Sequence, residues 1–138
     1  MESIYYKKYT NIKKKLHTNN ILLKNISFYD KIISNIVQLI KLLEEKKIAE
    51  AINLIHKDIK DNIHNLIKAI SDEDGNYILK SAELGEKLVH FYKTSLLQIQ
   101  LLPLSNEDSI VTINETLSTF KIIRDDFKKK MAKSTRAN

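Results

Sequence analysis

The sequence predicts an all-α protein: an antiparallel four-helix bundle with an N-terminal leader segment that packs on or near it. Three observations favour this fold class. The 138 residues include only two glycines and one proline, too few for the tight turns that a β-rich domain needs. Apolar residues recur mostly at spacings of three and four, which is typical of amphipathic helices. The length suits one domain that buries roughly two-thirds of its unfolded surface.

The first two helices are expected at about residues 19–46 and 48–71. Residues 18–20, Thr-Asn-Asn, provide side chains suited to an N-cap, and an apolar stripe follows them. The second stripe runs from Ile48 to Ile70 and consists mostly of isoleucine. Isoleucine is β-branched and favours a helix less than leucine does, so these helices must draw stability from packing.

The third and fourth helices are expected at about residues 77–102 and 106–132. Residues 71–76, Ser-Asp-Glu-Asp-Gly-Asn, are typical of a helix end followed by a turn. Pro103 cannot continue the third helix, and the polar residues that follow it are suited to capping the fourth. Short connections between the helices favour an antiparallel arrangement.

Two terminal segments lie outside the predicted bundle, which spans residues 18–133. Residues 1–17 are expected to form a flexible or groove-covering leader, and residues 134–138 a frayed tail. Residues 1–24 carry six lysines and one glutamate, and residues 121–138 carry seven lysines or arginines and two aspartates. The net charge of +6 is therefore concentrated at the ends of the chain, which suits an electrostatic role for these segments.

The sequence holds no pattern typical of an enzyme, a metal site or a cofactor site. Cysteine is absent, which excludes disulfides and thiolate ligands. No Glu-x-x-His pair of the kind that bundle di-iron sites use occurs. The acidic residues 72–76 lack the glycine and aspartate spacing of an EF-hand loop. The histidines have no serine and carboxylate to complete a triad. We therefore expect no enzyme activity, no metal and no cofactor.

No segment resembles a membrane span or a signal peptide. Lysine or glutamine interrupts each apolar run well before the roughly 20 residues that a span requires, and an apolar h-region is missing. We expect a cytoplasmic protein with no direct membrane insertion. The lysine runs at 13–15 and 128–130 leave nucleic-acid binding as a less favoured alternative, which would depend steeply on salt. No nucleic-acid partner is expected.

Three short steps in the predicted helices, together with a tyrosine pair ahead of them, resemble a known family in order and spacing. The steps are Phe28-Tyr29-Asp30, Leu88 to Tyr92, and Ile123-Arg124-Asp125-Asp126-Phe127, and the pair is Tyr6 and Tyr9. This set is similar to that of the flagellin-specific export chaperone family, FliS, from residue 6 to about residue 133. Phe28, Phe91 and Ile123 stand where the family usually has leucine, and Phe127 stands where it usually has tryptophan.

The resemblance implies a helical-bundle chaperone for flagellin. Members of this family hold the C-terminal segment of monomeric flagellin, prevent its assembly in the cytoplasm and deliver it to the cytosolic domain of the flagellar type III export gate. The resemblance places the contact with the gate at leader residues Tyr6, Tyr9 and Ile12. The alternatives are a helical adaptor or a chaperone for another secreted subunit. The leader tyrosines can also pack against the bundle at the start of the first helix.

The apolar stripes are wider than a single helix seam requires. Such a seam uses about two positions per heptad, and this chain often offers about three or four. The excess belongs to the core or to a groove for a client protein. The residues expected to line such a groove are Phe28, Tyr29, Leu88, Phe91, Tyr92, Phe120 and Phe127. Phe91 and Tyr92 are adjacent, so they point about 100° apart, and which of them faces the groove stays open.

Overall fold

The computed structural model describes residues 4–70 and 82–136, with side-chain positions for residues 23–70, 83–130 and 132. All regular structure in this part of the chain is helical, which confirms the predicted all-α class there. The elements are α1 (Ile4–Glu44), α2 (Ile48–Leu54), the π-helical turn η1 (Ile55–Ile59), α3 (Lys60–Ala69), α4 (Ala82–Leu101) and α5 (Asp108–Arg136).

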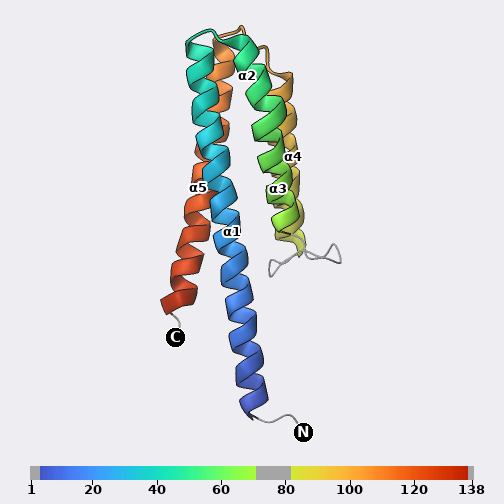
Figure 1. Cartoon of the computed structure of the whole chain (residues 1–138), viewed down its shortest axis with the longest axis vertical. Coiled ribbons are helices and arrows are strands. Elements are labelled where there is room, and N and C mark those ends of the chain that lie inside the picture. Colours follow the sequence, from blue (N-terminus) through green and yellow to red (C-terminus); the bar gives the residue numbers. More distant parts are fainter. Residues whose placement is uncertain (1–3, 71–81, 137–138) are drawn as a thin grey trace.

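The helices lie side by side as long rods (Figure 1). The chain rises along α1, returns along α2, η1 and α3, rises again along α4 and descends along α5 (Figure 1). α1 packs against α5 and also against α2 and α3, and α4 packs against α3 and η1. The apolar stripes of the rods face one another, and the buried residues join into one hydrophobic core.

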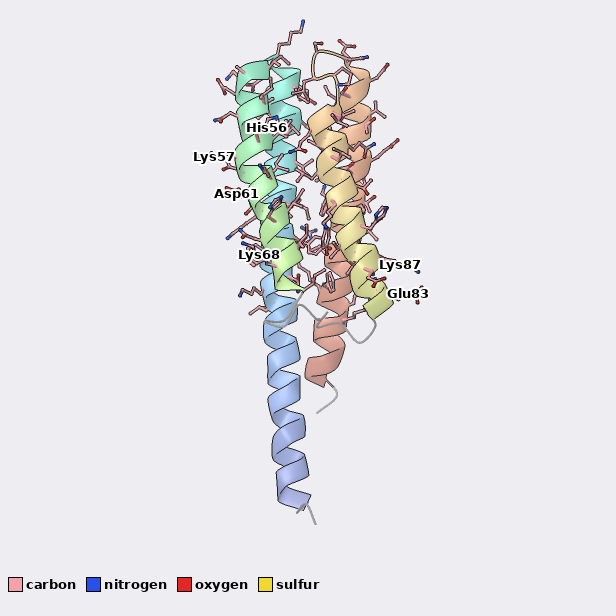
Figure 2. All side chains as sticks on the ribbon, turned by 90° about the vertical axis from the view of Figure 1, so that its right-hand side faces the viewer. His56, Lys57, Asp61, Lys68, Glu83 and Lys87 are labelled. Atoms are coloured by element: carbon pink, nitrogen blue, oxygen red, sulfur yellow. The ribbon has the colours of Figure 1, made fainter. Side chains whose placement is uncertain are left out.

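The α1 helix begins at Ile4, not near residue 19 as the sequence predicted. The Thr-Asn-Asn stretch at 18–20 continues the helix, because no glycine or proline interrupts α1 and its lysines and leucines are strong helix formers. Residues 4–17 therefore belong to α1 and do not form a separate leader. This part of α1 runs past the ends of the other helices in two perpendicular views (Figures 1 and 2).

The turn between α1 and α2 has the hydrogen bonds of a Schellman motif. The Lys47 N–H donates to the Leu42 carbonyl at 2.8 Å, and the Lys46 N–H donates to the Leu43 carbonyl at 3.1 Å. Lys46 has a φ of 59°, a left-handed conformation that glycine adopts most easily. The predicted end of the first helix near Lys46 is therefore close to the observed one at Glu44.

The single helix predicted at 48–71 is built from α2, η1 and α3 in succession. Its buried residues follow one another mostly in steps of four: Ala51, Ile55, Ile59, Ile63, Leu66 and Ile70. In a regular α-helix each step of four rotates the stripe by about 40°. The wider π turn at η1 absorbs part of this rotation, so the stripe keeps facing the core while Ile52 is exposed.

The remaining helix ends agree in part with the sequence. The α4 helix ends at Leu101, ahead of Pro103 as predicted, whereas its predicted start at 77 and the turn at 71–76 lie outside the described residues. Before α5, the Asn106 Oδ1 accepts a hydrogen bond from the Asp108 N–H at 3.0 Å. The α5 helix continues to Arg136, beyond its predicted end at residue 132, and the fraying expected at residues 134–138 stays a prediction.

Candidate functional site

The three family-like steps meet in one aromatic cluster between α1, α4 and α5. Tyr29 is fully buried and has its ring centroid 5.9 Å from that of Tyr92, 5.7 Å from that of Phe120 and 5.6 Å from that of Phe127. Phe91 joins at the edge, 5.0 Å from the Phe120 ring. Aromatic pairs at these separations attract each other beyond the effect of their burial. The cluster therefore ties three helices together.

A hydrogen bond between two tyrosine hydroxyls lies inside the cluster. The Tyr29 and Tyr92 hydroxyls bond to each other, and either oxygen can be the donor. Burial raises the pKa of both hydroxyls well above the usual range of tyrosine, and the neighbouring Tyr92 adds to the increase at Tyr29. Both phenols therefore stay neutral at ordinary pH. Each hydroxyl gives the other a hydrogen-bond partner inside the core.

An ion pair joins α5 to α1 beside the aromatic cluster. The Arg124 Nη1 lies 3.3 Å from the Asp30 Oδ1, and its Nε lies 3.2 Å from the Asp125 Oδ1. Asp30 follows Tyr29 directly in the sequence, and Arg124 precedes Phe127 by three residues. Exposed pairs of this kind contribute about 0.2–1 kcal/mol each, so the pair orients α5 on α1 more than it stabilises the fold.

Most of the predicted groove residues belong to the core instead. The structure buries five of them: Tyr29, Leu88, Tyr92, Phe120 and Phe127. Their assignment to an open groove is wrong for this structure, because α1, α4 and α5 close on one another and the side chains contact each other. Phe28 and Phe91 are only partly buried and pack against the rim of the core. Of the adjacent pair on α4, Phe91 is thus the outer residue.

The other predicted contact residues are in the N-terminal part of α1. Tyr6, Tyr9 and Ile12 fall within this helix, but their side chains lie outside the described residues. Their contact with the export gate stays a prediction. Leu23, the first described side chain of α1, is exposed over 57% of its surface.

Several large apolar side chains outside the predicted groove set are exposed. These are Leu23, Val37, Ile52, Leu84, Leu97, Leu101, Val111 and Ile122. Two of them come from the doubled pairs Leu96-Leu97 and Leu101-Leu102 on and just after α4. Both members of the pairs Ile32-Ile33 and Leu42-Leu43 on α1 are buried instead. A doubled apolar pair in the sequence therefore does not by itself predict exposed apolar surface.

One groove lies where the α1–α2 turn meets the connection between α4 and α5, and we call it the end groove. Its volume is about 590 Å³. Its apolar lining is Leu43, Ile48, Leu104, Ile110 and Val111, and its polar lining is Glu44, Lys46, Ser105, Asn106 and Glu107. Apolar side chains bordered by exposed charged ones are typical of sites that anchor a partner's apolar residues.

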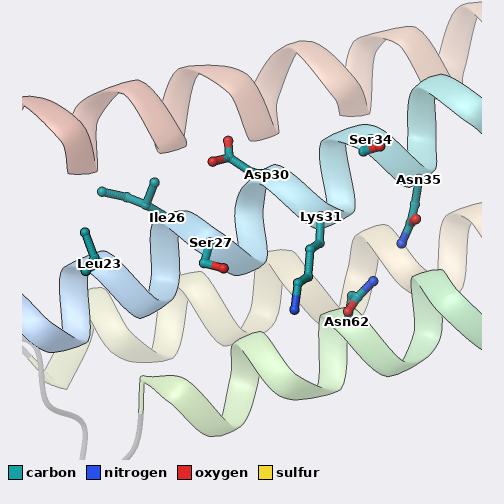
Figure 3. A pocket seen from close by; sticks show the side chains of 8 residues that line it. All are labelled: Leu23, Ile26, Ser27, Asp30, Lys31, Ser34, Asn35 and Asn62. Carbon is teal, nitrogen blue, oxygen red and sulfur yellow. The ribbon is translucent and has the colours of Figure 1, made fainter.

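A second, more open hollow of about 570 Å³ lies along α1 on the side of α3. Seven of its lining residues come from α1, and Asn62 comes from α3 (Figure 3). The Lys31 and Asn35 side chains extend toward α3 (Figure 3), and the Asn35 Nδ2 has no hydrogen-bond partner among the described residues. Because this hollow is more open than the end groove, it would enclose the apolar side chains of a partner less completely.

Polar side chains of both charges lie on the outer faces of η1, α3 and α4, beside the exposed leucines of α4. Figure 2 shows His56, Lys57, Asp61 and Lys68 on one rod and Glu83 and Lys87 on the next. Lys87 and Glu83 form an ion pair at 3.2 Å. Charges of both signs mark a solvated face rather than a surface for a polyanion.

The described residues contain neither a metal-binding cluster nor a membrane-spanning helix. Among the described side chains, those of residues 23–70, 83–130 and 132, no three His, Asp or Glu residues gather closely enough to hold a metal ion. None of the helices described combines the length and the apolar sequence that crossing a membrane requires. No family model, no curated protein and no solved structure matches the chain.

Proposed function

We propose that this protein is an antiparallel four-helix bundle that acts in the cytoplasm as a flagellin-specific export chaperone. In this role it holds the C-terminal segment of monomeric flagellin, prevents premature assembly and presents the client to the cytosolic domain of the flagellar type III export gate. Residues Tyr6, Tyr9 and Ile12 are the proposed contact with the gate. The activity is binding alone and needs no catalytic residue.

The observation that carries this proposal is the convergence of the three family-like steps. Tyr29 and Tyr92 are 63 positions apart and share a hydrogen bond, and Asp30 and Arg124 are 94 positions apart and share an ion pair. A signature spread over three helices is expected when its members pack on one another. The contacts support treating the steps as one unit, which strengthens the resemblance to FliS.

The end groove is the proposed client site, in place of the aromatic residues that the structure buries. It presents apolar side chains, among them the exposed Val111, at one end of the rods. A client helix that buries about four apolar anchors there gains roughly 6–12 kcal/mol, at about 1.5–3 kcal/mol each. Ordering the client costs about 2–5 kcal/mol of this gain. The remaining free energy is roughly 1–10 kcal/mol, and the upper end of this range corresponds to a micromolar complex.

A polymerisation assay tests the chaperone activity. Monomeric flagellin from the same organism is seeded with short filaments, and elongation is followed by light scattering with and without the protein. An equimolar amount of the protein should suppress elongation, because the bound C-terminal segment is no longer free to join a filament. Unchanged elongation at a large molar excess of folded protein would refute the proposal. A folded four-helix protein without an end groove is the control for nonspecific effects.

A further inference from the structure

The N-terminal part of α1 extends away from its own bundle. The α1 helix spans 41 residues, and in two perpendicular views its N-terminal part runs beyond the ends of α3, α4 and α5 (Figures 1 and 2). A helix of this length draws most of its stability from packing against a partner. The projecting part is therefore a candidate for an interaction that the bundle does not itself supply.

The sequence of this part has the spacing of a coiled-coil seam. Apolar residues stand at positions 5, 9, 12, 16 and 23, and asparagine stands at 19, so the steps alternate between four and three. The last of them, Leu23, has a described side chain that is 57% exposed. Two apolar positions per seven residues is the pattern of a seam between two helices. A polar residue such as Asn19 within a seam fixes the register of pairing.

The charges beside the seam select the kind of partner. In the heptad that this spacing defines, Lys8, Lys13 and Lys15 occupy the e and g positions that flank the seam. Residues 4–23 contain five lysines and no aspartate or glutamate. Pairing with a second copy would set lysine against lysine, which is unfavourable. A partner with glutamate or aspartate at its own flanking positions would pair favourably.

We infer that residues 4–23 form a heterotypic helix-pairing site that takes an acidic amphipathic helix of another protein. A lipid surface fits less well, because membrane-surface helices present a broad apolar face, whereas Asn19 interrupts this stripe and Lys8 and Lys15 flank it. The partner helix spans about three heptads, carries apolar residues at its seam positions and sets a polar residue opposite Asn19. This inference does not rest on binding of the client: it shares Tyr9 and Ile12 with the proposed gate contact, and it concerns the opposite end of the rods from the end groove.

The test uses the full chain and two designed helical peptides as probes. Both peptides have leucine at the seam and one asparagine to face Asn19; one has glutamate at every e and g position, and the other has lysine there. Binding is followed by the fluorescence anisotropy of labelled peptide as protein is added. The acidic peptide should bind at least about tenfold more tightly than the basic one, and more weakly as salt is raised.

Two double variants with equal loss of charge separate seam pairing from general attraction. Lys8→Glu with Lys15→Glu changes two flanking g positions, and Lys7→Glu with Lys14→Glu changes two f positions away from the seam. The first variant should bind the acidic peptide about tenfold or more weakly than the wild type does, because attractive charge pairs become repulsive. The second variant should lose less than about threefold in affinity for this peptide. Circular dichroism of each variant checks that the helices are intact.

Four results would overturn the inference. The first is equal weakening by the two double variants, and the second is equal binding of the two peptides. The third is sedimentation of the protein with anionic phosphatidylserine vesicles in the absence of any peptide binding, which would assign the segment to lipid. The fourth is a dimer in analytical ultracentrifugation that Ile12→Asp abolishes, which would assign it to a second copy. Because no assay uses flagellin, failure here leaves the proposed chaperone function to its own test.

Discussion

The hydroxyls of Tyr29 and Tyr92 meet in the interior between α1 and α4, where each is the polar partner of the other. A buried hydroxyl that loses its partner costs about 1–3 kcal/mol. The pair therefore fixes how α4 sits against α1, since sliding either helix by one turn would separate the two oxygens. Apolar side chains at both positions would fill the space without that constraint.

The first prediction concerns this pair. Tyr29→Phe alone should lower the free energy of unfolding by about 1–3 kcal/mol, because the Tyr92 hydroxyl stays buried without its partner. The double variant Tyr29→Phe, Tyr92→Phe should have a free energy of unfolding closer to that of the wild type than either single variant has, since both buried hydroxyls are gone. Urea unfolding of the four proteins in a double-mutant cycle measures this. Additive losses in the double variant would mean that the hydroxyls are not coupled.

The second prediction is a loss of stability in alkali. Burial raises the pKa of Tyr29 and Tyr92 above that of tyrosine in the unfolded chain. Above about pH 10 the unfolded chain releases these protons and the folded one keeps them, so each tyrosine lowers stability by about 1.4 kcal/mol per pH unit. Below that pH the two residues cause no pH dependence. Urea unfolding at pH 9 to 11 should therefore show a steeper decline for the wild type than for the Tyr29→Phe, Tyr92→Phe protein.

At the scale of the helices and turns, the α1–α2 turn uses a lysine where glycine fits best. Lys46 has a φ of 59°, whereas Lys47 beside it has a φ of −87°. The left-handed conformation costs a residue with a Cβ atom about 1–2 kcal/mol, and glycine avoids this cost. Glycine also loses more conformational entropy on folding, by about 0.4–1 kcal/mol.

Lys46→Gly should therefore stabilise the protein by about 0.5–1 kcal/mol. Lys47→Gly is the matched control, because the same side chain is removed at a negative φ, and it should destabilise the protein. The midpoints of thermal unfolding rank the three proteins. A lower midpoint for Lys46→Gly than for the wild type would contradict the turn geometry.

The helices themselves were largely predictable from the sequence because their signals are local. Apolar spacing predicted four helical rods, and Pro103 predicted the end of α4. The start of α1 was not predicted, because an N-cap sequence such as that at residues 18–20 also fits inside a long helix. The π turn was not predicted either, since it depends on how Ile55 and Ile59 both reach the core.

The candidate site was less predictable, because burial depends on how the helices close. Tyr29, Phe120 and Phe127 lie on apolar stripes that sequence alone cannot divide into core and groove. The distances between helices decide that division, and they follow from packing of the whole set of side chains. Val111 in the end groove escaped notice because it lies beside Ile110, a similar residue that is more buried.

The fourth prediction compares two exposed residues on α5. Val111 and Ile122 are exposed over 59% and 62% of their surfaces, and only Val111 lines the end groove. Val111→Asp should weaken binding of the flagellin C-terminal segment by about tenfold or more, because a charge replaces an apolar contact. Ile122→Asp should leave the affinity within about threefold. Equal losses would remove the end groove as the client site.

At the scale of the whole molecule, the two ends of the rods differ in charge and in surface. The N-terminal part of α1 and the C-terminal part of α5 lie toward the same end (Figure 1), and both are rich in lysine. The end groove lies at the opposite end, between the α1–α2 turn and the α4–α5 connection. The proposed client and the proposed helical partner would therefore occupy opposite ends of the rods.

Isothermal titration of the protein with the C-terminal segment of flagellin from the same organism tests the chaperone proposal most directly. We expect one-to-one binding with a clearly negative heat-capacity change, since an apolar groove is buried and the client becomes ordered. A lower affinity for the segment with Val111→Asp, together with an unchanged affinity with Ile122→Asp, would locate the client site in the end groove. No binding at tens of micromolar by a protein that circular dichroism shows to be folded would contradict the proposal and favour a helical adaptor for a different partner.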